Sequence, residues 1–120
     1  MKRDMDVVRL ILMRQESGEA PPELAKYTED LIVYNVALMK DAGLVEAVIA
    51  NDADGSPRAA VIIRLTWAGH DFLDAARDDT LWRKAKEKVL KPTASWTFGL
   101  LMEWLKQEIR TRIPGLESIH

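Results

Sequence analysis

His70 and Asp74 stand one helical turn apart in a stretch with helical patterning, and that spacing can place both side chains on one metal ion. Asp71 and Asp78 lie nearby, but two adjacent helical turns supply at most two or three ligands. The second histidine, His120, is the last residue of the chain. The pattern is therefore more typical of an exposed helix pair than of a metal site, and we expect no bound metal.

Other residue patterns that support catalysis are absent from the sequence. The pair Asp78-Asp79 is better explained as the negative charge at a helix N-terminus than as two catalytic carboxylates. The sequence contains no glycine-rich phosphate loop, nucleophile elbow or zinc-protease helix. It also has no cysteine, which excludes disulfides, thiolate metal sites and thiol nucleophiles. We therefore expect no enzyme activity, no cofactor and no small-molecule ligand.

Residues 83–91 form a concentrated basic segment, which contains five lysines and arginines and a single acidic residue, Glu87. Together with Trp82, this segment could lie along a phosphate backbone, although a solvated helix face is the commoner explanation. The whole chain carries a formal net charge of −2, so it lacks the broad positive field of many nucleic-acid binders. Any DNA binding is expected to be weak and largely independent of sequence, through four basic residues of this segment: Arg83, Lys84, Lys86 and Lys88.

The composition is that of an ordinary globular protein. The chain has 120 residues, of which 48% are hydrophobic and 30% charged, and this size is enough for one core without disulfides or metals. No apolar run approaches the ~20 residues that a membrane-spanning helix needs. The first residues include Asp4 and Asp6 and are not followed by an apolar signal segment. We expect a cytoplasmic protein with no membrane partner.

Apolar spacing and turn residues define the elements that position these side chains. The sequence predicts a helix from about Asp4 to Glu16, a break at Pro21-Pro22 with room for one short turn, and a second helix over residues 28–42. Two strands follow, over residues 44–50 and 59–65. The next helix begins at Thr66 and continues or kinks at Asp78-Asp79 towards Pro92, and a last helix starts between Ser95 and Thr97. This order predicts an α+β fold: a winged helix-turn-helix-like domain over residues 1–92, and a C-terminal helical extension over residues 93–120. The extension is expected to pack on this domain or on a second subunit.

Four segments resemble domain-of-unknown-function family 2513, a family of uncharacterised bacterial and bacteriophage proteins. They are residues 1–6 (MKRDMD), residues 38–45 (LMKDAGLV), residues 64–82 with the run LTWAGHDFLD, and residues 95–98 (SWTF). The resemblance covers nearly the whole chain. It implies a fold and a phage or prophage setting, and it implies no catalytic residue.

A broader resemblance is to winged-helix regulators, which share Leu-x-x-Ala-Gly-Leu-Val before a hairpin and Leu-Thr-x-x-Gly-x-x-Phe-Leu after it. In those proteins the helix before the hairpin reads the DNA major groove. Here that helix spans residues 28–42, and its buried stripe is expected at Ile32, Val36 and Met39. Its groove-facing positions would then be Val33, Tyr34, Asn35, Ala37 and Leu38.

Of these groove-facing residues, only Asn35 is a usual base reader. The helix also has one basic residue, Lys40, against three acidic residues, which makes contact with phosphates unfavourable. Its apolar outer face instead favours packing against another element or another copy of the chain, with DNA and a foreign protein as the alternatives. The expected function is therefore a non-enzymatic binding module of phage or prophage type. DNA binding or regulation is the first hypothesis, and a protein-interaction or dimerisation role without DNA binding is the second.

The last helix carries apolar residues at spacings of three and four, typical of helices that pack side by side. We expect a homodimer through this helix, and the alternative is that it folds back onto Tyr34 and Leu38 in a monomer. The expected interface residues are Tyr34, Leu38, Phe98, Leu101, Trp104, Leu105 and Ile109. The expected core of the domain is Leu12, Ile32, Val36, Met39, Leu44, Ile62, Leu65, Phe72 and Leu73.

Overall fold

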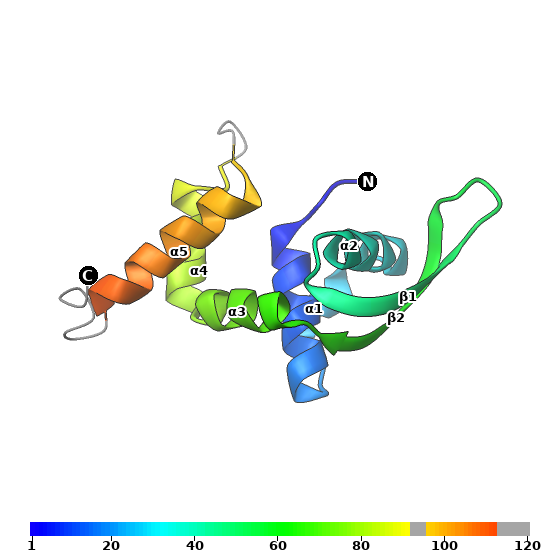
Figure 1. The fold of residues 1–120 in the computed structure, drawn as a ribbon, viewed down its shortest axis with the longest axis horizontal. Coiled ribbons are helices and arrows are strands. Elements are labelled where there is room, and N and C mark those ends of the chain that lie inside the picture. The colour runs from blue at the N-terminus through cyan, green and yellow to red at the C-terminus, as the bar shows by residue number, and fades with distance from the viewer. Residues whose placement is uncertain (92–95, 113–120) are drawn as a thin grey trace. The chain divides into compact units, whose positions relative to one another are not determined.

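The computed structural model describes residues 1–91 and 96–112. In this part of the chain the elements are α1 (Met5–Ser17), the 3-10 helix η1 (Pro22–Lys26), α2 (Glu29–Asp41), β1 (Val45–Asn51), β2 (Pro57–Leu65), α3 (Trp67–Ala76), α4 (Asp79–Lys88) and α5 (Phe98–Arg112). The fold is α+β and consistent with a winged-helix-like layout, in which α1, η1 and α2 precede the hairpin, as Figure 1 shows. The chain divides into two compact units, Met1–Leu73 and Asp74–His120.

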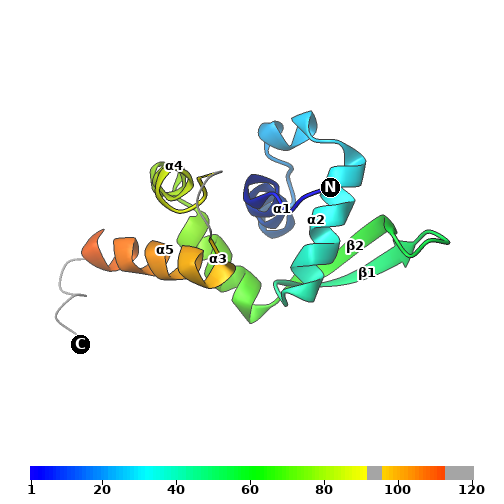
Figure 2. The same ribbon diagram turned by 90° about the horizontal axis from the view of Figure 1, so that it is seen from above.

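In the first unit, α2 packs between α1 and one face of the β-hairpin, and Figure 2 shows this arrangement from above. Asp4 caps α1, because its side chain accepts the backbone N–H groups of Asp6 and Val7. Thr28 caps α2 in the same way through the N–H of Leu31. The expected short turn after the double proline is η1, whose Leu24 is buried. These caps fix where α1 and α2 begin.

The core lies between these helices and the hairpin. Seven of the nine expected core residues are buried: Leu12, Val36, Met39, Leu44, Leu65, Phe72 and Leu73. Ile32 and Ile62 are only half-buried. The side chain of Phe72 is fully buried, so it belongs to the centre of the core.

The junction between α2, the hairpin and α3 depends on backbone contacts. Gly43 follows α2 with a φ of 77°, a left-handed conformation that favours glycine. The Thr66 hydroxyl donates to the Gly43 carbonyl and accepts the Gly69 N–H at 3.1 Å. The Thr66 N–H donates to the Leu44 carbonyl at 3.0 Å. Thr66 thus begins α3 and ties it to the end of α2, which confirms its expected capping role.

The hairpin pairs β1 with β2 in an antiparallel register, with Val45 opposite Leu65 and Val48 opposite Val61. The register shifts once near the base, because Glu46 pairs with Arg64 whereas Ala47 pairs with Ile62. This shift leaves Ile63 without a partner, as the extra residue of a β-bulge. The bulge decides which side chains of β2 face outwards.

The second unit contains the end of α3 together with α4 and α5. The helix starting at Thr66 does not continue past Ala76, and α4 restarts after Asp78, whose carboxylate accepts the Leu81 N–H at 2.8 Å. Asp79 follows in the first turn, so the pair acts as the acidic N-terminus of a helix, as expected. α4 contacts α5. The unit boundary falls at residues 73 and 74, and the expected domain boundary at residue 92 stays a prediction.

Candidate functional site

The helix α2 occupies the position of a recognition helix, directly before the hairpin. Its Asn35 is fully buried. The Asn35 side-chain oxygen accepts the Asp4 N–H at 2.8 Å, and its amide nitrogen donates to the Leu31 carbonyl at 3.0 Å. Val33 is buried as well, with 4% of its surface exposed. The expectation that Asn35 and Val33 face a groove is therefore wrong, because both residues belong to the buried side of α2.

The outer side of α2 is acidic and partly apolar. Glu29, Asp30 and Asp41 are exposed, and Lys40 is the exposed basic residue of the helix. Tyr34 and Leu38, two of the expected interface residues, are half-buried. No polar amide of the kind that reads bases remains on this outer side, because Asn35 is inside.

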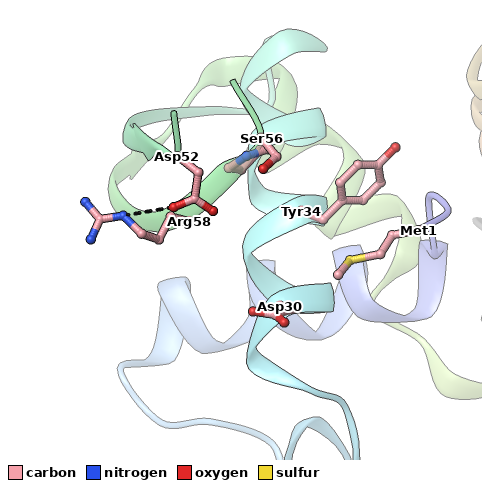
Figure 3. Close-up of a pocket in the computed structure, with 7 residues that line it drawn as sticks. Met1, Asp30, Tyr34, Asp52, Ser56 and Arg58 are labelled. Carbon is pink, nitrogen blue, oxygen red and sulfur yellow. Dashed lines mark ion pairs between the residues drawn. The ribbon is translucent and has the colours of Figure 1, made fainter. Parts of the chain in front are cut away.

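A shallow pocket of about 360 Å³ lies between α2 and the tip of the hairpin. Its lining, most of which Figure 3 labels, consists of Met1, Asp30, Tyr34, Asp52, Ser56, Pro57 and Arg58. The Arg58 Nε lies 3.6 Å from a carboxylate oxygen of Asp52, so the one guanidinium of the lining is paired with a carboxylate. The other charged side chain of the lining, Asp30, is negative, so the side chains of this pocket supply no unpaired positive charge for a phosphate.

The tip of the hairpin, residues 52–56, is a polar and exposed turn. The Ser56 N–H donates to the Asp54 carboxylate at 2.9 Å, and the Ser56 hydroxyl donates to the same oxygen. The hydrogen bonds from the Ser56 hydroxyl and N–H hold the pKa of Asp54 below its usual value. The tip thus presents the carboxylates of Asp52 and Asp54, and the nearby Arg58 is paired with Asp52, whereas minor-groove wings usually lead with arginine or lysine.

The expected nucleic-acid residues lie on α4. Arg83, Lys84, Lys86 and Lys88 are all exposed, and the structure brings them together on one helix. The opposite side of α4 is buried through an apolar stripe that consists of Leu81, Trp82 and Ala85. This division gives α4 a basic solvent-facing side.

The expected interface residues of α5 divide into two groups. Leu101 and Leu105 are fully buried within the chain. Phe98, Trp104 and Ile109 are half-buried. Part of the apolar stripe is thus already covered in a single copy of the chain, and the dimer seam through α5 stays a prediction.

His70 and Asp74 are both exposed on α3. The Asp74 carboxylate pairs with the Arg77 guanidinium at 3.0 Å, one turn along the chain. Among the described residues no group of three His, Asp or Glu side chains is placed to hold a metal ion. Within the same residues, no helix combines the length and the apolar character that crossing a bilayer demands.

Sequence reasoning missed the outer face of the hairpin. Val48, Val61 and Ile63 are 60%, 66% and 59% exposed. The signal was the run Val61-Ile62-Ile63, because a strand with one buried face alternates apolar and polar residues, whereas this run places apolar residues on both faces.

Charge is unevenly divided between the two units. Residues 1–73 contain eight lysines and arginines against twelve aspartates and glutamates, a net charge of −4. Residues 74–120 contain nine against seven, a net charge of +2. The unit with the winged-helix-like layout is therefore the acidic one, and the net positive charge belongs to the second unit.

Comparison with known proteins gives one family and one similar relative. A model of the family DUF2513, described as "Hypothetical protein (DUF2513)", matches residues 2–95. An uncharacterized protein of Haemophilus influenzae (strain Rd) is 33% identical over 123 residues, covering 97% of this chain and 98% of that protein. No solved structure matches.

Proposed function

The chain belongs to the DUF2513 family, and we propose that it is a non-enzymatic binding module, with a winged-helix-like scaffold, that engages another protein through the outer side of α2. The observation that carries this proposal is the burial of Asn35 beneath an acidic and partly apolar helix surface. The phage or prophage setting implied by the family resemblance is part of the proposal.

Charge argues against groove binding by α2. A helix in the major groove lies between two phosphate backbones, and productive contacts neutralise phosphates with lysine or arginine. Docking α2 there would bring Glu29, Asp30 and Asp41 towards phosphates, with only Lys40 to offset them. Half-buried Tyr34 and Leu38 offer apolar area, which protein partners use and phosphates do not.

The test maps which surface responds to which ligand. We expect random-sequence duplex DNA at low salt to leave the backbone amide NMR signals of Tyr34 and Leu38 unchanged. A photo-crosslinking amino acid at Tyr34 should give a discrete protein adduct in cells, and the same group at the exposed Glu19 should not. DNA-induced shifts centred on α2, or equal crosslinking from both positions, would contradict the proposal.

A second candidate function is nucleic-acid contact through α4, favoured by the exposure of Arg83, Lys84, Lys86 and Lys88 along one helix. Such contact would be electrostatic and independent of sequence. If about three phosphates are neutralised, the slope of log affinity against log salt is near −3. Fluorescence anisotropy with a duplex at several salt concentrations measures this slope.

Charge reversal at Lys84 and Lys86 provides the variant for the same titration. We expect it to abolish duplex binding, whereas Lys26→Glu on η1, a lysine that is also exposed, should keep it. Binding that survives both the reversal and high salt would exclude α4 as the contact.

A further inference from the structure

The outer face of the β-hairpin is an unusually apolar surface. Six large hydrophobic residues are exposed in the described part of the chain, and three of them, Val48, Val61 and Ile63, lie on this hairpin. α2 contacts the hairpin, and Figures 1 and 2 show it against one face only. Contiguous exposed apolar surface of this kind marks interaction sites in small proteins.

The register explains why these side chains share one face. Val48 pairs directly with Val61, so both point to the same side of the hairpin. At the bulge, Ile63 and Arg64 together oppose Glu46, and both are exposed. Ile63 lies two residues from Val61 and so shares its face, and the bulge turns Arg64 to this face as well and Leu65 inwards.

The charges on this face are balanced. The Arg64 guanidinium donates two hydrogen bonds to the Glu46 carboxylate, at 2.9 and 2.8 Å. Glu46 and Arg64 form one cross-strand pair, next to the apolar pair along the strands. The face thus has an apolar centre with one carboxylate and one guanidinium beside it, and its net charge is zero.

We propose that this face binds a second copy of the chain, with the two hairpins stacked face to face around a two-fold axis that runs along the strands. The axis runs midway between the two strands and between the two stacked hairpins, so rotation about it exchanges the positions of β1 and β2. Each residue of β1 then lies over the β2 residue, in the second copy, that is its pairing partner in the register. Val48 then lies over Val61 of the partner subunit. Glu46 lies over Arg64 of the partner subunit, and four charges of alternating sign form one network.

This complementarity selects a second copy over other occupants. Nucleic acid and charged peptides need a net charge of opposite sign, which this face lacks. A two-fold contact needs a patch that is complementary to itself. Glu46 and Arg64 meet this need, because the rotation places each of them over the oppositely charged residue of the second copy. Because the patch is only one hairpin wide, the interface is small and the dimer weak. The inference does not depend on the proposed role of α2.

The decisive experiment mixes two charge variants of the full chain. Glu46→Arg places two arginines on the face, and Arg64→Glu places two glutamates there. Each variant alone should fail to dimerise, because like charges face each other across the axis. An equimolar mixture should recover a heterodimer, because arginines then meet glutamates. Sedimentation equilibrium over a range of concentrations measures all three samples and the unmodified chain.

A matched pair of apolar variants tests the centre of the face. Val61→Asp should raise the dimer dissociation constant at least about tenfold. Leu100→Asp is the control, since Leu100 is also exposed, at 54%, but lies on α5. It should leave the dimer intact. Circular dichroism confirms that each variant remains folded, as expected for side chains that are largely in solvent.

The opposite outcomes would overturn the inference. An unmodified chain that stays monomeric at every concentration leaves no dimer to explain. A dimer that survives Glu46→Arg and Val61→Asp but is lost in Leu100→Asp would assign the contact to α5 instead. Single charge variants that lose the dimer without recovery on mixing would show that the two-fold arrangement is wrong.

Discussion

Gly69→Ala tests the junction that joins α2, the hairpin and α3. A Cβ added at Gly69 would lie 2.0 Å from the Leu44 carbonyl oxygen and 3.1 Å from its carbon. Ordinary contact starts near 3.4 Å, so the backbones must separate by about 1.4 Å. The Leu44 carbonyl cannot turn aside without loss, because it accepts the Thr66 N–H at 3.0 Å.

The expected loss of stability follows from three contributions. Overpacking of this kind costs about 2 kcal/mol. Weakening the hydrogen bond from Thr66 to Leu44 costs about 1 kcal/mol. The higher helix propensity of alanine, compared with glycine, raises the free energy of unfolding by about 1 kcal/mol and offsets part of this loss. The free energy of unfolding of the Gly69→Ala variant should therefore fall by about 2 kcal/mol.

Gly99→Ala is the matched control, because the added Cβ meets only the Thr97 hydroxyl oxygen, at an ordinary contact distance of 3.7 Å. This variant should be neutral or gain up to about 1 kcal/mol. Urea unfolding followed by circular dichroism gives both values, and amide hydrogen exchange on α2 reports on the first unit alone. If the two variants differ by less than about 0.5 kcal/mol, the close approach at Gly69 does not constrain the fold.

Three further predictions test the core, the buried amide and the hairpin pair. Phe72→Ala or Leu65→Ala should lower the free energy of unfolding by about 2–5 kcal/mol, and losses below about 0.5 kcal/mol at both sites in urea unfolding would show that the core is misassigned. Asn35→Ala should lower the free energy of unfolding, measured in urea, by about 1–3 kcal/mol, because the Asp4 N–H loses its acceptor. The same variant should leave the affinity for duplex DNA, measured by fluorescence anisotropy, unchanged. The hydrogen bond from Arg64 lowers the pKa of Glu46, so the pair stabilises the fold fully above the ordinary glutamate pKa and is lost as pH falls through the lowered value. NMR titration of the Glu46 carboxylate in Arg64→Ala should show a higher pKa, and an unchanged pKa would refute the assigned cause.

The sequence predicts the element order well because strong local signals mark each boundary. Thr28 and Thr66 are N-caps in the structure, as their residue type and position indicate. The polar turn between the strands and the acidic start of α4 at Asp78 are also local chemistry. Signals of this kind depend on a few neighbouring residues, so they can be recognised in the sequence without knowledge of tertiary contacts.

The faces of α2 and of the hairpin were harder to predict. Apolar residues surround most of α2, and its buried stripe was expected at Ile32, Val36 and Met39. Val36 and Met39 are buried, but Val33 and Asn35 are buried in place of Ile32. The amide of Asn35 is inside because Asp4, distant in sequence, supplies its partner, and no local pattern shows such a contact. The bulge at Ile63 likewise depends on the pairing of two strands.

The residues that carry the winged-helix resemblance have structural roles at one junction. Gly43 provides the left-handed turn after α2, and Thr66 hydrogen bonds to both Gly43 and Gly69. Gly69 leaves room for the Leu44 carbonyl. None of these roles involves a ligand, so the same motif can support proteins whose exposed faces differ completely. The resemblance therefore concerns the scaffold alone, and the proposed functions depend on the acidic side of α2, the basic side of α4 and the apolar face of the hairpin.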